Sequence, residues 1–207
     1  AAGGRTSGMS ADLGELNVSR ETIQKLEHYA DLVTKWTRRI NLIAPSSIDD
    51  IWRRHIVDSA QLVAIAPDTS TSWVDLGSGA GFPGLVIAVI WSETQPRNHV
   101  TLVESDQRKA TFLRQAAREL AVAVVIHTDR AETLPPANTD VLSARALAPL
   151  ADLLPLAQRH LSPTGAAIFP KGRNAAAEIA EARKSWRFDL AIRDSVTDHE
   201  GRILRIE

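Results

Sequence analysis

A cluster of glycines close to an aspartate is the part of this chain best suited to bind a ligand. Residues 73–84 have the sequence WVDLGSGAGFPG, in which an apolar, strand-like run ends at Asp75 and glycines follow at 77, 79, 81 and 84. Glycine lets backbone amides approach a ligand closely and lets the chain turn with positive φ. A strand, a glycine loop and a helix form the unit with which α/β proteins hold a nucleotide-like cofactor. The chemistry of this chain therefore depends on which cofactor the loop accepts.

Two classes of cofactor fit the loop to different degrees. Residues 79–84 match the G-x-G-x-x-G template for dinucleotides, but that template is weak by itself. The longer pattern places Asp75 two residues before Gly77, where a carboxylate would repel a pyrophosphate and attract an ammonium or sulfonium group. S-adenosylmethionine carries both cationic groups and no phosphate, so we predict it as the cofactor; the alternative is that the glycines only form a turn. The predicted binding loop comprises Asp75, Gly77, Ser78, Gly79 and Gly81.

Composition limits the class of protein. A chain of 207 residues can hold one domain of ~150 residues and an extension. The absence of cysteine excludes disulfides, thiol nucleophiles and thiolate metal sites, and it suits a reducing cytosol. No apolar run reaches the ~18 residues of a membrane span, so we expect a cytoplasmic protein without a membrane segment. With a net charge of −1, any nucleic-acid surface must be a local basic patch.

The pattern along the chain divides it into three parts. Residues 1–18 are expected to be a disordered tail, with Met9, the only methionine, as the natural start after residues left from cloning. Residues 19–66 are expected to form a helical extension, since apolar side chains recur at steps of three and four from Ile23 to Ile40 behind the N-cap candidate Ser19. A second helix is predicted over 47–64.

Residues 67–207 have the alternation of an α/β domain. Strands are predicted at 73–76, 100–104, 123–127, 140–144 and 166–169, separated by helices at 84–91, 107–120, 149–160 and 174–185. Such alternation predicts right-handed crossovers and a parallel sheet covered on both faces. Two further strand-like runs, 188–192 and 202–206, have no helix between them and should pair as an antiparallel hairpin. This ending is typical of methyltransferase sheets and unusual in dinucleotide dehydrogenases.

Several polar residues follow the predicted strands and should meet at the ligand edge of the sheet. Glu104 could accept hydrogen bonds from ribose hydroxyls, and the loop 129–132 could contact an adenine or be an exposed turn. Arg145 could orient the substrate or bind the cofactor carboxylate, although a lone arginine is as often a surface group. Lys171 is a candidate for binding substrate or an RNA phosphate.

Several motifs occur in one order that matches a known family. They are RHIVDS at 54–59, the loop at 75–84, ESDQRK at 104–109 with Phe112-Leu113, RAE at 130–132, SARA at 143–146 and Lys171-Gly172. Over about residues 20–207 the chain resembles the bacterial 16S ribosomal RNA guanine-N7 methyltransferases, also called glucose-inhibited division protein B. The resemblance implies a Rossmann-like class I S-adenosylmethionine-dependent methyltransferase fold. It would have a mostly parallel seven-stranded sheet, a C-terminal antiparallel hairpin and the N-terminal helical extension.

The resemblance also implies roles for residues. Gly77 and Phe82 would line the methionine and ribose end of the cofactor, Ala131 and Glu132 would contact its adenine, and Arg145 would lie at the junction of cofactor and substrate. The expected partner is 16S ribosomal RNA in the small subunit, and a monomer without metal is expected. Guanine N7 has a lone pair and no proton at neutral pH, so its methylation needs alignment of the reactants and no general base.

Other interpretations remain open from the sequence. One is an S-adenosylmethionine-dependent methyltransferase acting on a different RNA, a protein or a small molecule. A nicotinamide oxidoreductase is disfavoured by Asp75, and a non-enzymatic RNA-binding module would leave the glycine loop without a use. His55 either faces RNA or links the extension to the core, and the linking role is favoured. The RNA-binding candidates are Lys35, Arg38, Arg39, Arg53, Arg54, Lys171 and Arg173.

Overall fold

The computed structural model describes residues 13, 14 and 16–207, and a seven-stranded sheet organises this part of the chain. The strand order is β3-β2-β1-β4-β5-β7-β6, and the first five strands in sequence are parallel. The strands are β1 (Ser72–Leu76), β2 (His99–Val103), β3 (Val125–His127), β4 (Thr139–Ala144), β5 (Leu161–Lys171), β6 (Leu190–Asp194) and β7 (Arg202–Ile206). All seven predicted strands are confirmed, six of them within two residues at each end, whereas β5 begins five residues before its predicted start at 166.

The predicted C-terminal hairpin is also confirmed, and it has a further consequence for the sheet. β6 and β7 pair antiparallel, and β7 also pairs antiparallel with β5, from Ala167 opposite Ile206 to Lys171 opposite Arg202. The last strand therefore inserts between β5 and β6, and the loop between β6 and β7 reaches the same edge of the sheet as the carboxyl ends of the parallel strands.

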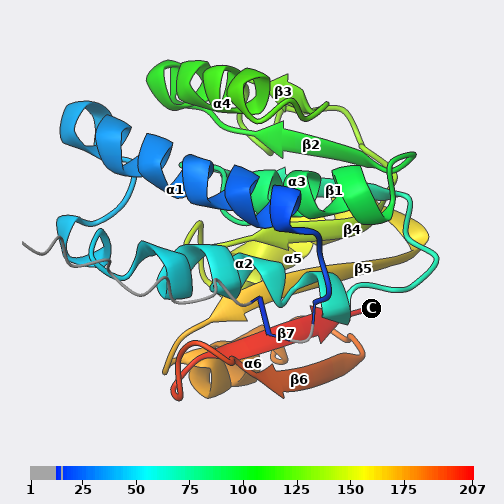
Figure 1. Ribbon diagram of the computed structural model, residues 1–207. Helices are drawn as coiled ribbons and strands as arrows, with labels where there is room; N and C mark the ends of the chain where they lie inside the picture. The colour runs from blue at the N-terminus through cyan, green and yellow to red at the C-terminus, as the bar shows by residue number, and fades with distance from the viewer. Residues whose placement is uncertain (1–12, 15) are drawn as a thin grey trace, which may run out of the picture.

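Helices cover both faces of the sheet (Figure 1). On one face lie α1 (Arg20–Ile40), α2 (Asp58–Ala60), α3 (Gly84–Thr94) and α4 (Gln107–Glu119), and on the other lie α5 (Leu150–His160) and α6 (Ala175–Ala182). Each face of the sheet has its own buried apolar cluster, because successive side chains of a strand point to opposite faces. Trp73 belongs to the first cluster and Val74 to the second. The predicted doubly covered α/β sheet is confirmed.

The helical extension packs directly against helix α3 of the α/β domain. α3 is buried at every residue from Gly84 to Trp91, since the sheet lies on one side of it and the extension on the other. Ser19 caps α1 as predicted, accepting a hydrogen bond from the amide of Thr22 at 3.2 Å. Leu26 and Val33 of α1 share one core cluster with α3, so the core is continuous across the domain boundary predicted at residue 66. That boundary stays a prediction.

The second predicted helix, 47–64, is not one regular helix. It consists of a short 3₁₀ turn at Pro45–Ser47, a π-helical segment at Trp52–Val57, α2, and another 3₁₀ turn at Val63–Ile65. A π-helical segment widens the turn by a residue and redirects side chains, and such segments occur often at functional sites. Periodicity of apolar residues indicates a helix here and does not distinguish its π segment.

A tail was predicted over residues 1–18, and most of these residues lie outside the part of the chain that the structure describes. Within the part that is described, Leu13 is buried and Leu16 and Val18 pack against the first apolar cluster. Among the described residues, none of the helices has both the length and the apolar character that crossing a membrane requires.

Candidate functional site

Asp75 lies beneath the glycine loop and holds it to the sheet. The carboxylate is fully buried, and its Oδ1 accepts a hydrogen bond from Ser143 Oγ at 2.7 Å while Oδ2 accepts one from the Gly84 amide at 3.2 Å. Ser143 Oγ in turn accepts a hydrogen bond from the indole of Trp73 at 2.8 Å. Burial raises the pKa of Asp75 to about 6. Asp75 thus joins β1, β4 and the start of α3, and its carboxylate is not on the cleft wall described below.

The loop above Asp75 needs its glycines for conformation and for space. Gly77, Gly79 and Gly81 have φ values of 65°, 56° and 92°, which glycine adopts without the steric cost that other residues incur. A Cβ at Gly81 would lie 2.5 Å from the hydroxyl oxygen of Tyr29. The buried Tyr29 hydroxyl donates a hydrogen bond to the Ala80 carbonyl, and its ring lies 5.2 Å from the ring of Phe82. Tyr29, which the sequence did not single out, therefore fixes the loop from the extension.

Glu104 ties the tip of β2 to the same loop. Its Oε2 accepts a hydrogen bond from the Gly79 amide and its Oε1 one from the Asp106 amide, both at 2.7 Å. Asp106 caps α4 by accepting hydrogen bonds from the amides of Arg108 and Lys109. Each carboxylate oxygen of Glu104 has a second lone pair, so ribose recognition by Glu104 stays a prediction.

A cleft of about 790 Å³ opens beside the loop. Gly77, Ser78, Gly79, Phe82 and Arg145, all predicted as site residues, line it. A smaller cavity of about 80 Å³ adjoins Gly77 on another side, and it is lined by Ala131 and Glu132. The structure therefore brings most of the predicted cofactor residues together around Gly77, while Asp75, Gly81 and Glu104 support the loop from below and from the side.

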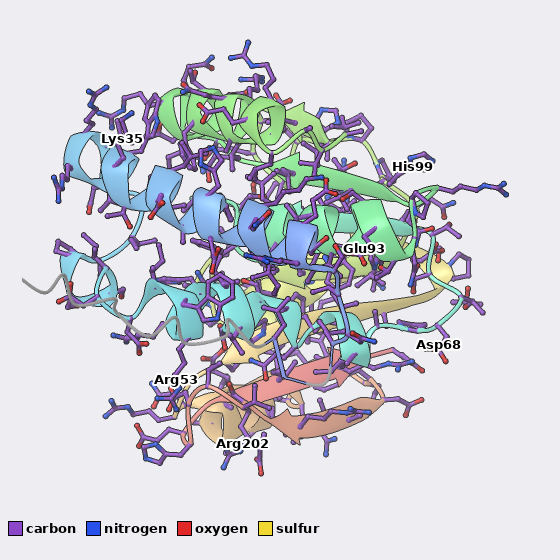
Figure 2. The ribbon with its side chains drawn as sticks, viewed as in Figure 1. Lys35, Arg53, Asp68, Glu93, His99 and Arg202 are labelled. Carbon is purple, nitrogen blue, oxygen red and sulfur yellow. The ribbon has the colours of Figure 1, made fainter. Side chains whose placement is uncertain are left out.

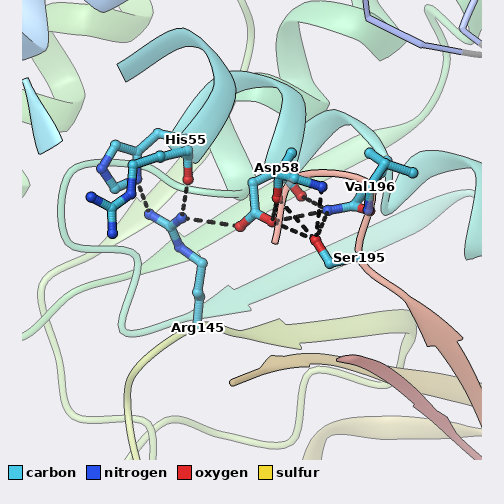
Figure 3. Close-up of polar contacts among 8 residues, drawn as sticks. His55, Asp58, Arg145, Ser195 and Val196 are labelled. Carbon is cyan, nitrogen blue, oxygen red and sulfur yellow. Dashed lines mark hydrogen bonds and ion pairs between the residues drawn. The ribbon is translucent and has the colours of Figure 1, made fainter. Parts of the chain in front are cut away.

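Arg145 is held in the cleft by three groups of the extension (Figure 3). Its Nη1 donates hydrogen bonds to the Arg54 carbonyl and to Asp58 Oδ2, each at 3.3 Å, and its Nη2 donates to His55 Nδ1 at 2.8 Å. The guanidinium also lies over the Phe82 ring at 5.3 Å. These groups fix both the position and the plane of the guanidinium, because a fork of donors is satisfied only in one orientation.

His55 is a neutral acceptor in this arrangement. Burial, together with the positive charges of Arg145 and Arg54, lowers the pKa of His55 to about 4. Because a guanidinium can only donate, His55 Nδ1 accepts and the ring proton lies on Nε2, which is buried and has no hydrogen-bond partner among the described residues. The imidazole also stacks on Phe82 at 4.9 Å. His55 thus links the extension to the core, as favoured from the sequence, and it lines the cleft as well.

Asp58 connects Arg145 to the C-terminal hairpin. Its Oδ1 accepts hydrogen bonds from Thr197 Oγ1 at 2.7 Å, from Gln61 Nε2 at 2.9 Å and from Ser195 Oγ at 3.4 Å (Figure 3). Asp58 belongs to the RHIVDS segment at 54–59, and its role was not predicted from the sequence. The available signal was its place three residues after His55, which is one helical turn and therefore the same face.

Lys171 is engaged inside the protein. Its Nζ lies 2.8 Å from Glu178 Oε2 and donates a hydrogen bond to the Ala148 carbonyl at 2.8 Å, and its side chain is only 9% exposed. It lines a separate cavity of about 480 Å³ that shares Arg145 with the main cleft. Contact with an RNA phosphate, one of the roles predicted for Lys171, would have to compete with these two partners.

The other basic candidates do not gather in one place. Arg53 and Arg54 lie on the wall of the main cleft together with Lys109. Figure 2 shows Lys35 near the end of α1, well apart from Arg53 and Arg202. The predicted basic candidates are therefore divided between the cleft wall, with Arg53 and Arg54, and the end of α1, with Lys35, Arg38 and Arg39. In the described part of the chain, no group of three or more histidine, aspartate or glutamate side chains could hold a metal ion.

Fold and site together define a Rossmann-like class I methyltransferase: a sheet of the order 3-2-1-4-5-7-6 whose glycine loop and strand tips line a cleft. The chain belongs to the family described as rRNA small subunit methyltransferase G, whose model matches residues 22–205.

Relatives of high identity support this membership over nearly the whole chain. A ribosomal RNA small subunit methyltransferase G of Cereibacter sphaeroides is 56% identical over 192 residues, which cover 93% of this chain and 92% of the relative. One from Ruegeria pomeroyi is 48% identical and covers 96% of this chain and 97% of the relative.

Solved structures at low identity support the fold. A SAM-dependent methyltransferase from Aquifex aeolicus superposes with a TM-score of 0.62 at 10% identity, covering 86% of this chain and 97% of its own. A ribosomal protein L11 methylase from Lactobacillus delbrueckii superposes with a TM-score of 0.61 at 16% identity, covering 74% and 78%. The predicted Rossmann-like methyltransferase fold is confirmed.

Proposed function

We propose that this protein transfers a methyl group from S-adenosylmethionine to N7 of a guanine in 16S ribosomal RNA of the small ribosomal subunit. The observation that carries the proposal is the family match over residues 22–205 together with relatives 48–56% identical over almost their full length. At such identity and coverage, the alternative of a methyltransferase acting on another RNA, a protein or a small molecule is not favoured.

The residues at the cleft fit S-adenosylmethionine. The loop glycines leave open backbone beside Ser78 and Phe82 for the methionine part, and the small cavity at Ala131 and Glu132 suits an adenine. Glu104, at the tip of β2, is bonded to the Gly79 amide of the loop and has lone pairs left for ribose hydroxyls. Arg145 is a cation within the same cleft and would attract a carboxylate. When bound, the cofactor supplies an electrophilic methyl group on a sulfonium.

The role of the protein in the reaction is alignment and control of charge. Guanine N7 attacks with its own lone pair, so no side chain has to remove a proton, and none of the described cleft residues needs to act as a nucleophile. His55 remains neutral because its pKa is about 4, and it holds Arg145 through Nδ1 without adding positive charge near the sulfonium. Arg145, fixed at three points, would orient the reactants at the junction of cofactor and substrate.

We further propose a division of labour along the chain and a monomeric state. Residues 19–66 would be a helical extension that braces the cleft, and residues 67–207 the methyltransferase domain. The extension supplies Tyr29, His55 and Asp58 to the loop and the cleft, which supports a functional role for it beyond packing.

The direct test is transfer of labelled methyl from S-adenosylmethionine to small subunits from cells that lack the endogenous enzyme. The product is mapped by chemical cleavage at N7-methylguanine. Label at one guanine in the decoding region is the expected result. Binding of the cofactor in calorimetry without label in the RNA would instead favour a methyltransferase with a different substrate.

A further inference from the structure

A second cavity adjoins the main cleft and has no role in the account so far. It has a volume of about 480 Å³, and Arg145, Ala146, Asp58 and Asp198 line both it and the cleft. Its walls come from the loop after β4, the end of β5, the helix α6 and the loop before β7. Because the two spaces meet at Arg145, a group bound in this cavity would lie next to a cofactor bound in the cleft.

A half-buried pair of opposite charges faces this cavity. Lys171, with its side chain 9% exposed, and Glu178, 25% exposed, lie with Nζ and Oε2 2.8 Å apart, and both line the cavity. Lys171 donates one hydrogen bond, to the Ala148 carbonyl, and is ion-paired with Glu178 Oε2. Glu178 Oε2 accepts from the amide of Leu150 at 2.8 Å. The lysine has three hydrogens and the carboxylate a second oxygen, so the pair can offer a ligand a donor beside an acceptor.

This order of donor and acceptor is complementary to guanine. The Watson–Crick edge of guanine has the acceptor O6 beside the donors N1–H and N2–H₂, whereas adenine has the donor N6–H₂ beside the acceptor N1. Lys171 can only donate and an ionised glutamate can only accept, so the pair matches O6 beside N1–H of guanine. Adenine offers an acceptor and a donor in the reverse order, so it would have to bind turned over, with its N7 on the side of Glu178 instead of the side of Lys171. Side chains without hydrogen-bonding groups, among them those of Pro149 and Pro170, line the cavity and offer surface to a flat ring.

We propose that this cavity binds the target guanine, with Lys171 donating to O6 and Glu178 accepting from N1–H and N2–H₂. The proposal rests on the function proposed above and deepens it, because it assigns the recognition of the base. N7 lies next to O6 and away from N2 on the ring, so recognition of this edge leaves the N7 lone pair free. Lys171 is then a residue that determines base specificity, and Glu178 its partner.

The test compares guanine with inosine, which lacks only the N2 amino group, at the target position of reconstituted small subunits. For the unchanged protein, kcat/KM for methyl transfer should be about 10- to 100-fold higher with guanine, because Glu178 loses one partner in inosine. In Glu178→Gln the amide oxygen can keep the contacts with Lys171 and with the Leu150 amide. The NH₂ group of the glutamine then faces the donors N1–H and N2–H₂ of the base. We expect kcat/KM with guanine to fall about 10- to 100-fold and the guanine-to-inosine ratio to narrow to about three or less.

Glu181→Gln is the matched control on the same helix. Glu181 is 64% exposed and pairs only with the exposed Lys184 in the described structure, so this variant should keep both the rate and the base preference. Cofactor binding, measured by calorimetry, should be equal in all three proteins.

Two results would overturn the proposal. One is equal methylation of guanine and inosine by the unchanged protein. This result does not depend on whether a variant folds. The other is a Glu178→Gln protein that keeps the guanine-to-inosine ratio of the unchanged protein. A complete lack of methyl transfer to guanine subunits by the unchanged protein is a different failure, since it would remove the proposed function itself and this inference with it.

Discussion

The two sides of the ligand edge are built in different ways. On the side of the glycine loop, Asp75 is fully buried and bonds to Ser143 and the Gly84 amide, so the support comes from β1, the adjacent strand β4 and the helix that follows. On the side of Arg145, the support comes from Asp58 of the extension and Thr197 of the last hairpin, 139 positions apart in sequence. The loop side is centred on one segment, residues 75–84, which partners from other elements hold in place. The Arg145 side is assembled from the extension, the tip of β4 and the last hairpin.

This difference suggests different sensitivities. The loop side is buried and closely packed, so changes there should act mainly on stability. The Arg145 side is a partly exposed polar network, with side-chain exposures of 20% for Arg145 and 17% for Asp58, so changes there should act mainly on the rate of methyl transfer.

Gly81→Ala should have the largest effect on stability. The residue has φ 92°, and an added Cβ would lie 2.5 Å from the Tyr29 hydroxyl oxygen and 2.8 Å from Leu85 Cδ1. Left-handed strain of about 1–2 kcal/mol and overpacking of about 1–3 kcal/mol together predict a loss of about 2–5 kcal/mol in the free energy of unfolding, measured with urea.

Gly172→Ala is the control for this prediction, because nothing lies within 4 Å of the added Cβ and the backbone is not in the left-handed region. Its free energy of unfolding should change by less than about 0.5 kcal/mol. A Gly81→Ala protein as stable as Gly172→Ala would show that the loop is not packed as described.

The pH dependence of stability should separate the two sides by its sign. The pKa of His55 is lowered to about 4 from 6.5 by burial, so its contribution to stability is present above pH 6.5 and is lost as pH falls through 4. The pKa of Asp75 is raised to about 6 from 3.8 by burial, so its contribution is present below pH 3.8 and is lost as pH rises through 6. Between pH 4 and 6 the two groups therefore oppose each other.

Variants at the two positions should shift the stability profile in opposite directions. His55→Gln should make unfolding free energy rise less with pH over this range than in the unchanged protein, and Asp75→Asn should make it rise more. Urea unfolding at several pH values from 4 to 7 measures both slopes. If the slope of unfolding free energy against pH changed in the same direction in both variants, the pKa of His55 or of Asp75 would not be shifted by burial as described.

The sequence was sufficient for the parts that depend on neighbours in the chain. Alternating apolar runs predicted all seven strands, and the spacing of glycines behind Asp75 predicted the loop at the tip of β1. The role of Asp75 was less accessible: its charge suggested attraction to a cationic ligand, whereas the structure encloses the carboxylate below the loop. Whether a side chain is buried under a loop depends on β4 and α3, which a local pattern does not specify.

The polar network around Arg145 was not predictable in the same way. SARA at 143–146 marked Arg145 as a strand-tip residue, but its partners Arg54, His55 and Asp58 depend on how a π-helical segment of the extension docks on the sheet. Lys171 was placed correctly at a strand tip, and its pairing with Glu178 depends on the position of α6. Ion pairs between separate elements, such as these two, follow from tertiary packing, and no regular sequence spacing indicates them.

The most direct test of the Arg145 side is a double-mutant cycle between Asp58 and Arg145, with kcat/KM for methyl transfer to small subunits as the measured quantity. Asp58→Ala should lower kcat/KM by about 10- to 100-fold, because it removes a carboxylate that positions the guanidinium. Arg145→Lys should lower it by at least as much, because lysine keeps the charge and loses the planar fork of donors. If Asp58 acts through Arg145, the double variant should be little worse than Arg145→Lys alone. Losses that multiply in the double variant would contradict the account, because Asp58 and Arg145 would then act independently.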